Sequence, residues 1–110
     1  RPRQIFVPYN GKIADITETD TNKHTLDLET ALTETRKIIA LSITAKRMGG
    51  TGEFNCYPNE GAQPSLVGSS ASVYLRGMLI IKDGTQRLEY NLTVANDDWD
   101  LYCLGYVVEA

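Results

Sequence analysis

Apolar and polar residues alternate along most of the chain from residue 36 onward, which is the period-two pattern of β-strands with one buried side. Residues 37–46 and 53–57 both predict strands. The glycine-dense segment 48–52 between them predicts a turn, because glycine adopts positive φ at little cost. The positions expected to face inward are Ile39, Leu41, Ile43, Ala45, Phe54 and Cys56, and Ile38 and Ala40 also make the start of the first strand apolar on its other side.

Further strands are expected at 72–82, 86–94 and 99–108, with turns at 82–85 and 95–98. The first turn contains Asp83-Gly84, a strong hairpin signal. We therefore predict that these strands form a meander. The inward positions expected in the first two are Val73, Leu75, Leu79, Ile81, Leu88, Tyr90, Leu92 and Val94.

The last predicted strand, 99–108, is apolar on both sides. One side carries Trp99, Leu101, Cys103 and Val107, and the other carries Tyr102, Leu104, Tyr106 and Val108. A strand of this kind lies in the middle of a sheet or faces a partner molecule. We predict that the side with Tyr102, Leu104, Tyr106 and Val108 contacts a neighbouring subunit.

The pattern before residue 36 is less regular. Residues 24–29 alternate and predict a strand, followed by a loop at 33–35. A helix over 28–41 is the alternative, because leucines 28 and 32 and two later residues recur at nearly helical spacing. The many β-branched residues in this segment favour the strand.

Residues 1–12 combine apolar side chains with Pro2 and Pro8, which prevent a regular central strand. Such a segment either forms an edge strand of its own sandwich or extends as an arm onto a neighbour, where it can add to the edge of a sheet. We divide the chain into an arm, residues 1–12, and a single β-sandwich domain, residues 13–110. The arm residues predicted to contact a neighbour are Ile5, Phe6, Val7 and Tyr9.

Residues 58–71 predict a long polar loop that contains prolines, glycines and serines. Loops of this length in compact domains often carry binding functions. The loop is therefore a candidate recognition surface, and its candidate ligand-binding residues are Tyr57, Asn59 and Glu60.

Composition narrows the class of protein. The chain has 110 residues, of which 42% are hydrophobic and 23% charged, as in a single globular domain. The net charge of −3 provides no electrostatic attraction to nucleic acid. No apolar run approaches the ~20 residues that span a bilayer, and no long apolar region follows Arg1-Pro2-Arg3. We expect no nucleic-acid partner, no membrane partner and no signal peptide.

The residues that could carry chemistry are few. His24 is the only histidine, no Gly-x-Ser-x-Gly motif is present, and we expect no catalytic residues and no enzymatic activity. Cys56 and Cys103 could be free and buried or joined in one disulfide. Two cysteines and one distant histidine are too few ligands for a structural zinc site.

The densest group of oxygen ligands is Asn96–Asp100. It lacks the spacing of an EF-hand, and a turn in which Asn and Asp accept local backbone hydrogen bonds explains it equally well. Calcium remains an alternative here, with Asp15 or Asp20 from a second loop. We expect no cofactor and no metal.

The chain is similar to two groups of proteins. Ile43-Thr44-Ala45, the segment 52–58 and Leu104-Gly105-Tyr106 resemble elements of small β-sandwich modules on bacterial surface and secreted proteins. In organisation, with one short β-domain, an extended amino-terminal arm and no catalytic residues, the chain resembles the small decoration (cement) proteins of tailed-phage capsids. Both resemblances imply a protein that binds or assembles and does no chemistry.

The sequence therefore predicts an all-β fold, an antiparallel β-sandwich or jelly-roll-like domain of about seven or eight strands. We expect a structural protein of the virion surface that forms a homo-oligomer, binds the capsid shell protein, or does both. The small size and the lack of a signal peptide favour this over a carbohydrate-binding or adhesion module of the bacterial cell surface. Carbohydrate binding would require two or three aromatic side chains on one exposed face.

Overall fold

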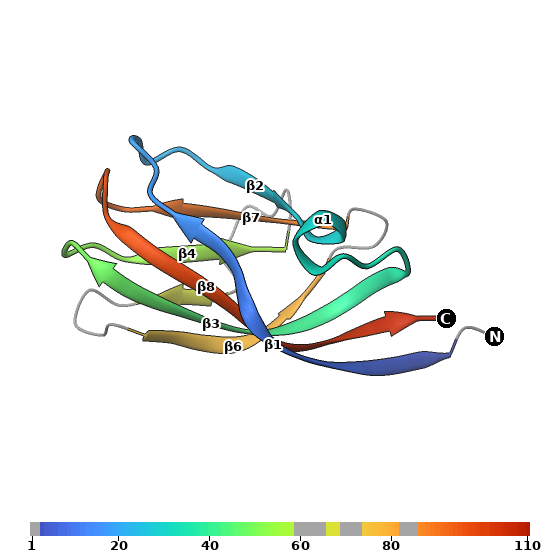
Figure 1. The fold of residues 1–110 in the computed structure, drawn as a ribbon. Helices are drawn as coiled ribbons and strands as arrows, with labels where there is room; N and C mark the ends of the chain where they lie inside the picture. Colours follow the sequence, from blue (N-terminus) through green and yellow to red (C-terminus); the bar gives the residue numbers. More distant parts are fainter. Residues whose placement is uncertain (1–2, 59–65, 69–73, 82–85) are drawn as a thin grey trace.

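The computed structural model describes residues 3–58, 66–68, 74–81 and 86–110. Within these residues the chain forms eight β-strands and one short helix (Figure 1). In order along the chain, the elements are β1 (Gln4–Ile16), β2 (His24–Asp27), α1 (Leu28–Leu32), β3 (Lys37–Gly49), β4 (Phe54–Tyr57), β5 (Leu66–Gly68), β6 (Tyr74–Ile80), β7 (Arg87–Leu92) and β8 (Asp98–Glu109).

The strands form two four-stranded sheets that pack against each other. The first sheet has the order β1-β8-β3-β6 and the second the order β2-β7-β4-β5, and all neighbouring strands are antiparallel. The chain passes repeatedly from one sheet to the other, and this strand order is that of an eight-stranded jelly roll. The predicted all-β sandwich is confirmed.

The predicted meander is wrong. β6 and β8 belong to the first sheet, where β3 separates them, and β7 belongs to the second. The turn predicted at 82–85 lies outside the described residues. A turn signal in the sequence indicates that the chain reverses, but the same signal serves a hairpin within one sheet and a crossing between two sheets. The alternation of apolar and polar residues along a strand also does not indicate which of the two sheets the strand joins.

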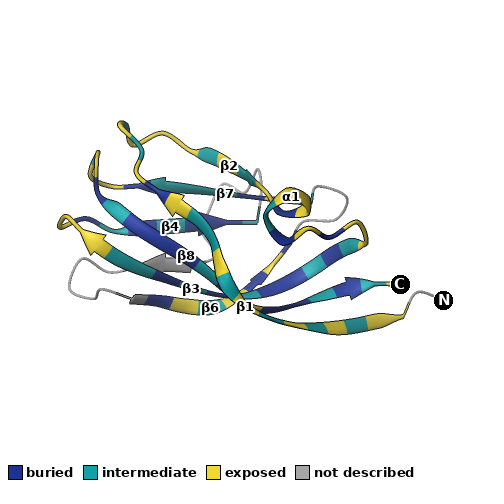
Figure 2. Cartoon of the chain, in the orientation of Figure 1, coloured by how far each residue is buried: buried dark blue, intermediate teal, exposed yellow. Residues whose placement is uncertain are grey.

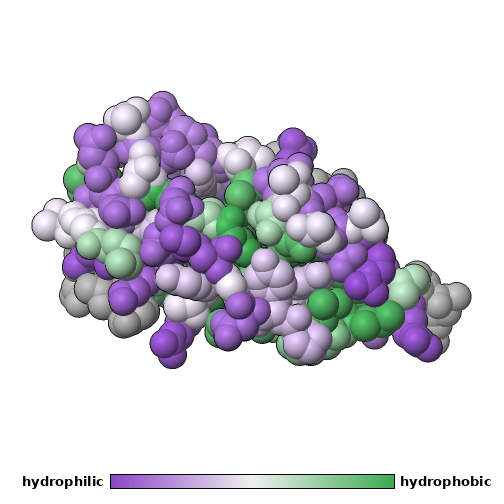
Figure 3. Space-filling model, viewed as in Figure 1, coloured by the Kyte–Doolittle hydropathy of each residue, from purple (hydrophilic) through white to green (hydrophobic). Residues whose placement is uncertain are grey.

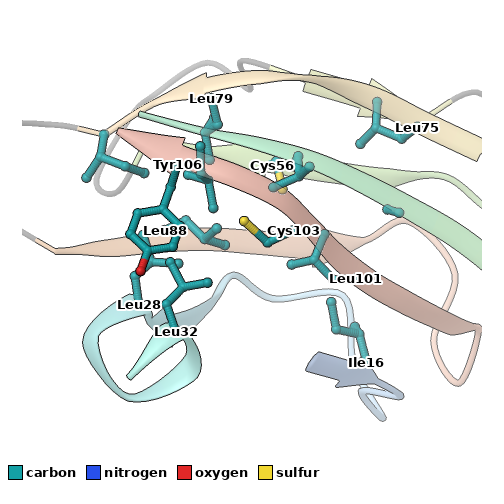
Figure 4. Close-up of a cluster of buried hydrophobic side chains, with 14 of the residues drawn as sticks. Ile16, Leu28, Leu32, Cys56, Leu75, Leu79, Leu88, Leu101, Cys103 and Tyr106 are labelled. Atoms are coloured by element: carbon teal, nitrogen blue, oxygen red, sulfur yellow. The ribbon is translucent and has the colours of Figure 1, made fainter. Parts of the chain in front are cut away.

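The core fills the space between the two sheets (Figures 2 and 4). Trp99 of β8 stacks on Phe54 of β4, with ring centroids 5.4 Å apart.

The structure confirms the predicted inward positions Leu41, Ile43, Ala45, Phe54, Cys56, Leu75, Leu79, Ile81, Leu88 and Leu92. Two predictions are wrong: Ile39 is only partly buried because the β3–β8 register shifts beside it, and Val94 follows the end of β7 and is 43% exposed. Tyr90 is half-buried, and Val73 lies outside the described residues.

The side-chain pattern of β8 differs from the prediction after Cys103. Ser42 pairs with Gly105 and the adjacent Ile43 pairs with Cys103, so Leu104 is an extra residue in β8. A bulge of this kind reverses which alternate residues face inward. Tyr106 and Val108 are therefore buried in the chain's own core, whereas Val107, predicted to share the inward side with Trp99, is not.

The segment 24–36 contains both a strand and a helical turn. β2 ends at Asp27, and α1 follows where the favoured prediction continued the strand to residue 29. The Asp27 carboxylate accepts hydrogen bonds from the backbone N–H of Glu29 at 3.0 Å and the hydroxyl of Thr30 at 3.2 Å, which caps the helix. Leu28 and Leu32 are buried, so the helical turn closes the sandwich at one end (Figure 4).

β1 is an edge strand of the first sheet. It pairs with β8 of the same chain from Gln4 to Ile16, with two shifts of register, and the N–H of Ala110 donates to the carbonyl of Arg3 at 2.8 Å. The boundary predicted after residue 12 falls inside this strand. Pro8 is tolerated because an edge strand needs only half of its backbone groups for pairing. The start of β1 and the end of β8 lie side by side at one end of the molecule (Figure 1).

Candidate functional site

Large apolar side chains are exposed on the outer face of the first sheet. Phe6 on β1 is 60% exposed, Met78 and Ile80 on β6 are 53% and 64% exposed, and Leu104 on β8 is 48% exposed. Scattered exposed apolar residues are ordinary, but a contiguous group marks an interaction surface. The register of the strands decides whether these four side chains form one group.

Paired residues in adjacent strands point to the same face of a sheet. One row of pairs crosses the whole first sheet: Phe6 with Val107, Val107 with Ala40, and Ala40 with Ile80. The next row joins Pro8, Gly105, Ser42 and Met78, with Leu104 in the bulge beside it. The intervening pair, Leu41 and Leu79, is fully buried, so these two rows face outward.

We call this surface the apolar band. Its exposed residues are Phe6, Met78, Ile80 and Leu104, and the half-buried Val107 and the small, 8% exposed Ala40 lie between them. The band extends across all four strands of the first sheet, and the two rows that form it carry no charged residue. Hydrophobic side chains also gather where the first half of β1 runs beside the end of β8 (Figure 3).

Charged residues border the band on both sides. On one side Lys37 and Glu109 form an ion pair at 3.2 Å. On the other side Lys12 donates a hydrogen bond to Asp15 at 2.9 Å and lies 3.9 Å from Asp100. An apolar centre with a polar margin is the usual anatomy of a protein–protein interface.

Lys12, Asp15 and Asp100, which border the band on this side, shift one another's pKa values. The hydrogen bond from Lys12 lowers the pKa of Asp15. A hydrogen bond with Asp15, followed by burial, raises the pKa of Asp100. Lys12 and the hydrogen bond between the two carboxyl groups thus link Asp15 and Asp100.

Only part of the predicted interface lies on the surface. Of the arm residues, Phe6 belongs to the band, while Ile5, Val7 and Tyr9 pack against the core. Of the last-strand residues, Leu104 belongs to the band and Tyr102 is half-buried, while Tyr106 and Val108 are 4% and 0% exposed. Met78 and Ile80 were missed. The signal for them was the run 78–81, which is apolar at successive positions and therefore on both faces of its strand.

The predicted ligand loop is only partly described. Tyr57 is buried, its hydroxyl donates to Oδ1 of Asn91 at 2.8 Å, and Nζ of Lys23 lies 4.1 Å from the centroid of its ring. Its hydroxyl and ring are thus occupied by contacts within the domain. Asn59 and Glu60 lie outside the described residues.

The acidic segment 96–100 holds two turns of the chain together. The carboxylate of Asp97 is 3% exposed and accepts the N–H of Gly52 at 2.6 Å. The N–H of Asn96 donates to the carbonyl of Glu18 at 2.8 Å. Across the residues that the structure describes, no three His, Cys, Asp or Glu side chains are grouped as metal ligands.

A second polar cluster was not predicted. Glu34 lies between α1 and β3, is 7% exposed, and accepts hydrogen bonds from Arg36 and from the hydroxyl of Tyr106. These hydrogen bonds, those from the Arg36 side chain first, lower the pKa of Glu34 to about 2. Figure 4 shows Tyr106 close to the turn of α1. The cluster fastens that turn to β8.

His24 faces carboxylates. Its Nε2 lies 2.8 Å from Oδ1 of Asp20, and its Nδ1 lies 3.9 Å from Glu18, which accepts the hydroxyl of Tyr90 at 2.9 Å. The imidazole also packs on the ring of Tyr90. This arrangement ties the 17–23 connection to β2 and β7.

Both cysteines are free and buried in the core (Figure 4). Burial raises the pKa of the Cys56 thiol to about 12 and also raises that of Cys103. A thiol reacts through its thiolate, so both are chemically protected in the folded chain.

Comparison with known protein families, curated proteins and solved structures gives no match to this chain. Among the described residues, no helix is long and apolar enough to cross a membrane.

Proposed function

We propose that this chain is a non-enzymatic structural subunit of a virus particle, a capsid decoration protein or another protein of the virion surface. The observation that carries this proposal is the apolar band, because a neutral apolar surface across a whole sheet is a protein-binding feature. A decoration protein needs such a surface to hold it on the particle or to hold its copies together.

The fold supports the proposal without deciding it. Jelly rolls occur in viral capsid proteins and also in lectins, so the fold is compatible with both functions that the sequence suggested. The choice between them depends on the side chains at the surface.

The carbohydrate-binding alternative has less support. A sugar-binding platform needs aromatic rings that are free on one face, and among the described side chains Phe6 is the only exposed aromatic residue. From the sequence, Tyr57, Tyr74, Tyr102 and Tyr106 are the candidates for stacking on sugars. Tyr57, Tyr102 and Tyr106 are buried or half-buried, and the side chain of Tyr74 lies outside the described part of the structure. Phe6 itself lies against Gly105 of the neighbouring strand.

The experiment that tests the function is a particle fractionation. Virus particles are purified on a density gradient from the biological material that encodes the chain, washed with salt, and analysed by quantitative mass spectrometry. We expect the chain to sediment with the shell protein at a fixed molar ratio. A chain found only in the particle-free fractions would refute the virion role, and a glycan array would then test the alternative.

A further inference from the structure

We propose that a second copy of this chain covers the apolar band, so that two first sheets pack face to face around a two-fold axis. This inference rests on the proposed structural function and names the partner of its surface.

The first sheet is large enough for a stable dimer. β3 has 13 residues, β8 has 12 and β1 has 13, and the molecule is 45 Å long. With a rise of about 3.3 Å per residue and a strand spacing of about 4.8 Å, the four strands present a face of roughly 700 Å². Standard protein–protein interfaces bury about 600–1,000 Å² on each partner. The band and its margins together therefore suffice, whereas the band alone does not.

The outer face of the first sheet has ridges and a trough of side chains that can fit those of a second copy. Met78 and Ile80 form a ridge along β6, and their partners on the adjacent β3 are the small residues Ser42 and Ala40. Beyond this trough, Leu104 and Phe6 form a second ridge on β8 and β1. A two-fold axis that runs along the sheet between β3 and β8 sets Leu104 and Val107 of each copy over the β3 trough of the other and β6 over β1, so that all four strands take part in the contact.

The charges of the face also favour a copy over a partner of opposite charge. The two rows of the band are uncharged, and Lys37 with Glu109 and Lys12 with Asp15 are paired within the chain at the margins. Beyond the band, Lys46 and Arg76 lie on the same outer face with Asp100, so the margins carry charges of both signs and the band itself carries no charge that would attract a strongly charged molecule.

A pair of matched variants tests the proposal. Met78 in the band is 53% exposed, and Met48, at the end of β3 and outside the band, is 52% exposed. Met78→Glu and Met48→Glu are therefore the same change at the same exposure. The wild-type chain and both variants are measured by size-exclusion chromatography with light scattering over a range of concentrations. Fluorescence of the buried Trp99 verifies that each variant is folded.

We expect the wild type and Met48→Glu to have twice the 12.2 kDa mass of the chain. Met78→Glu buries an unpaired charge in the dimer, so its dissociation constant should rise at least about 100-fold and the protein should elute as a folded monomer. A wild-type monomer at every concentration would overturn the inference. So would equal effects of the two variants, because the band would then not be the contact.

The outcome is separable from that of the particle fractionation. A monomer that still sediments with particles refutes the dimer and leaves the virion function standing, with the shell protein as the occupant of the band. A dimer that never sediments with particles supports the contact between copies and refutes the virion function.

Discussion

Glu34 fastens the segment between α1 and β3 to the last strand, and its replacement by glutamine should weaken the fold in a pH-dependent way. Oε2 accepts the backbone N–H and Nε–H of Arg36 at 2.9 and 3.0 Å. Oε1 accepts Nη2–H of Arg36 and the hydroxyl of Tyr106, both at 2.9 Å. Glu34→Gln keeps the shape of the side chain, but it removes the charge and turns one acceptor into a donor that faces other donors.

The magnitude follows from the pKa of the carboxyl group. The hydrogen bonds from Arg36 lower that pKa from 4.5 to about 2, which corresponds to about 3 kcal/mol of stability. The Arg36 side chain is 44% exposed, so solvent screens part of this interaction and about 2 kcal/mol remains. Hydrogen bonds to a charged group generally contribute about 1.5–3 kcal/mol, and this range agrees with the value worked from the pKa.

The sign of the pH dependence is determined by the direction of the shift. A carboxyl group whose pKa is lower in the folded state stabilises the fold fully above its unfolded value of 4.5. This stabilisation is lost as the pH falls from there through about 2. The destabilisation caused by Glu34→Gln should therefore be about 2 kcal/mol at pH 7 and should shrink steadily in acid.

Urea unfolding followed by the fluorescence of Trp99, the only tryptophan, measures this difference at several pH values. Glu29→Gln is the control, because Glu29 lies on α1 but is exposed. It should change stability by less than about 0.5 kcal/mol. If Glu34→Gln destabilised the chain equally at neutral and acid pH, the charge of Glu34 would not be the cause and the reasoning would fail.

Three further outcomes are expected. Leu79→Ala, fully buried, should cost about 2–5 kcal/mol in urea unfolding, whereas Ile80→Ala, 64% exposed on the other face, should cost far less; equal losses would contradict the assigned faces of β6. The thiols of Cys56 and Cys103 should react with a thiol reagent only after denaturation, and rapid labelling of the native chain would show that the core opens easily. Asp97→Ala leaves the N–H of Gly52 without its acceptor, which should cost about 1–3 kcal/mol and speed hydrogen exchange at that amide; unchanged exchange there would rule out the contact.

Much of the fold could be predicted because most strands obey simple alternation. β4 and β6 have the inward residues that the pattern indicated among those described, and β3 has them from Leu41 onward. β4, β6 and β3 from Leu41 to Lys46 contain no bulge of their own, so the period of two holds along each of them. The class of fold follows from such segments alone.

The errors occur where local sequence carries no information about pairing. The extra residue at Leu104 reverses the inward side of β8, and Ile39 does the same at the start of β3. Ile39 lies among apolar residues and gives no sign of a bulge, and Gly105 is the only local hint beside Leu104, because a bulge depends on the register against two other strands. The assignment of β7 to the second sheet fails for the same reason, since it depends on long-range contacts and not on the strand's own pattern.

The candidate site was half predicted. Phe6 and Leu104 were named as contact residues, but so were Tyr106 and Val108, which a sequence pattern cannot distinguish from them. The sequence does not distinguish an apolar side chain that packs in the core from one that is exposed on a binding surface. Only the register showed that Met78 and Ile80 complete the surface.

Gly105 connects the core to the surface. The bulge that it forms with Leu104 turns Tyr106 inward, where its hydroxyl reaches Glu34, and leaves Leu104 on the outer face. A Cβ at position 105 would lie 2.5 Å from Cζ of Phe6, so only glycine lets that ring lie across the strand. The bulge at these two residues of β8 therefore directs Tyr106 toward Glu34 inside the sandwich and shapes the band outside it. This coupling explains why one strand contributes both to the core and to the surface that we propose for assembly.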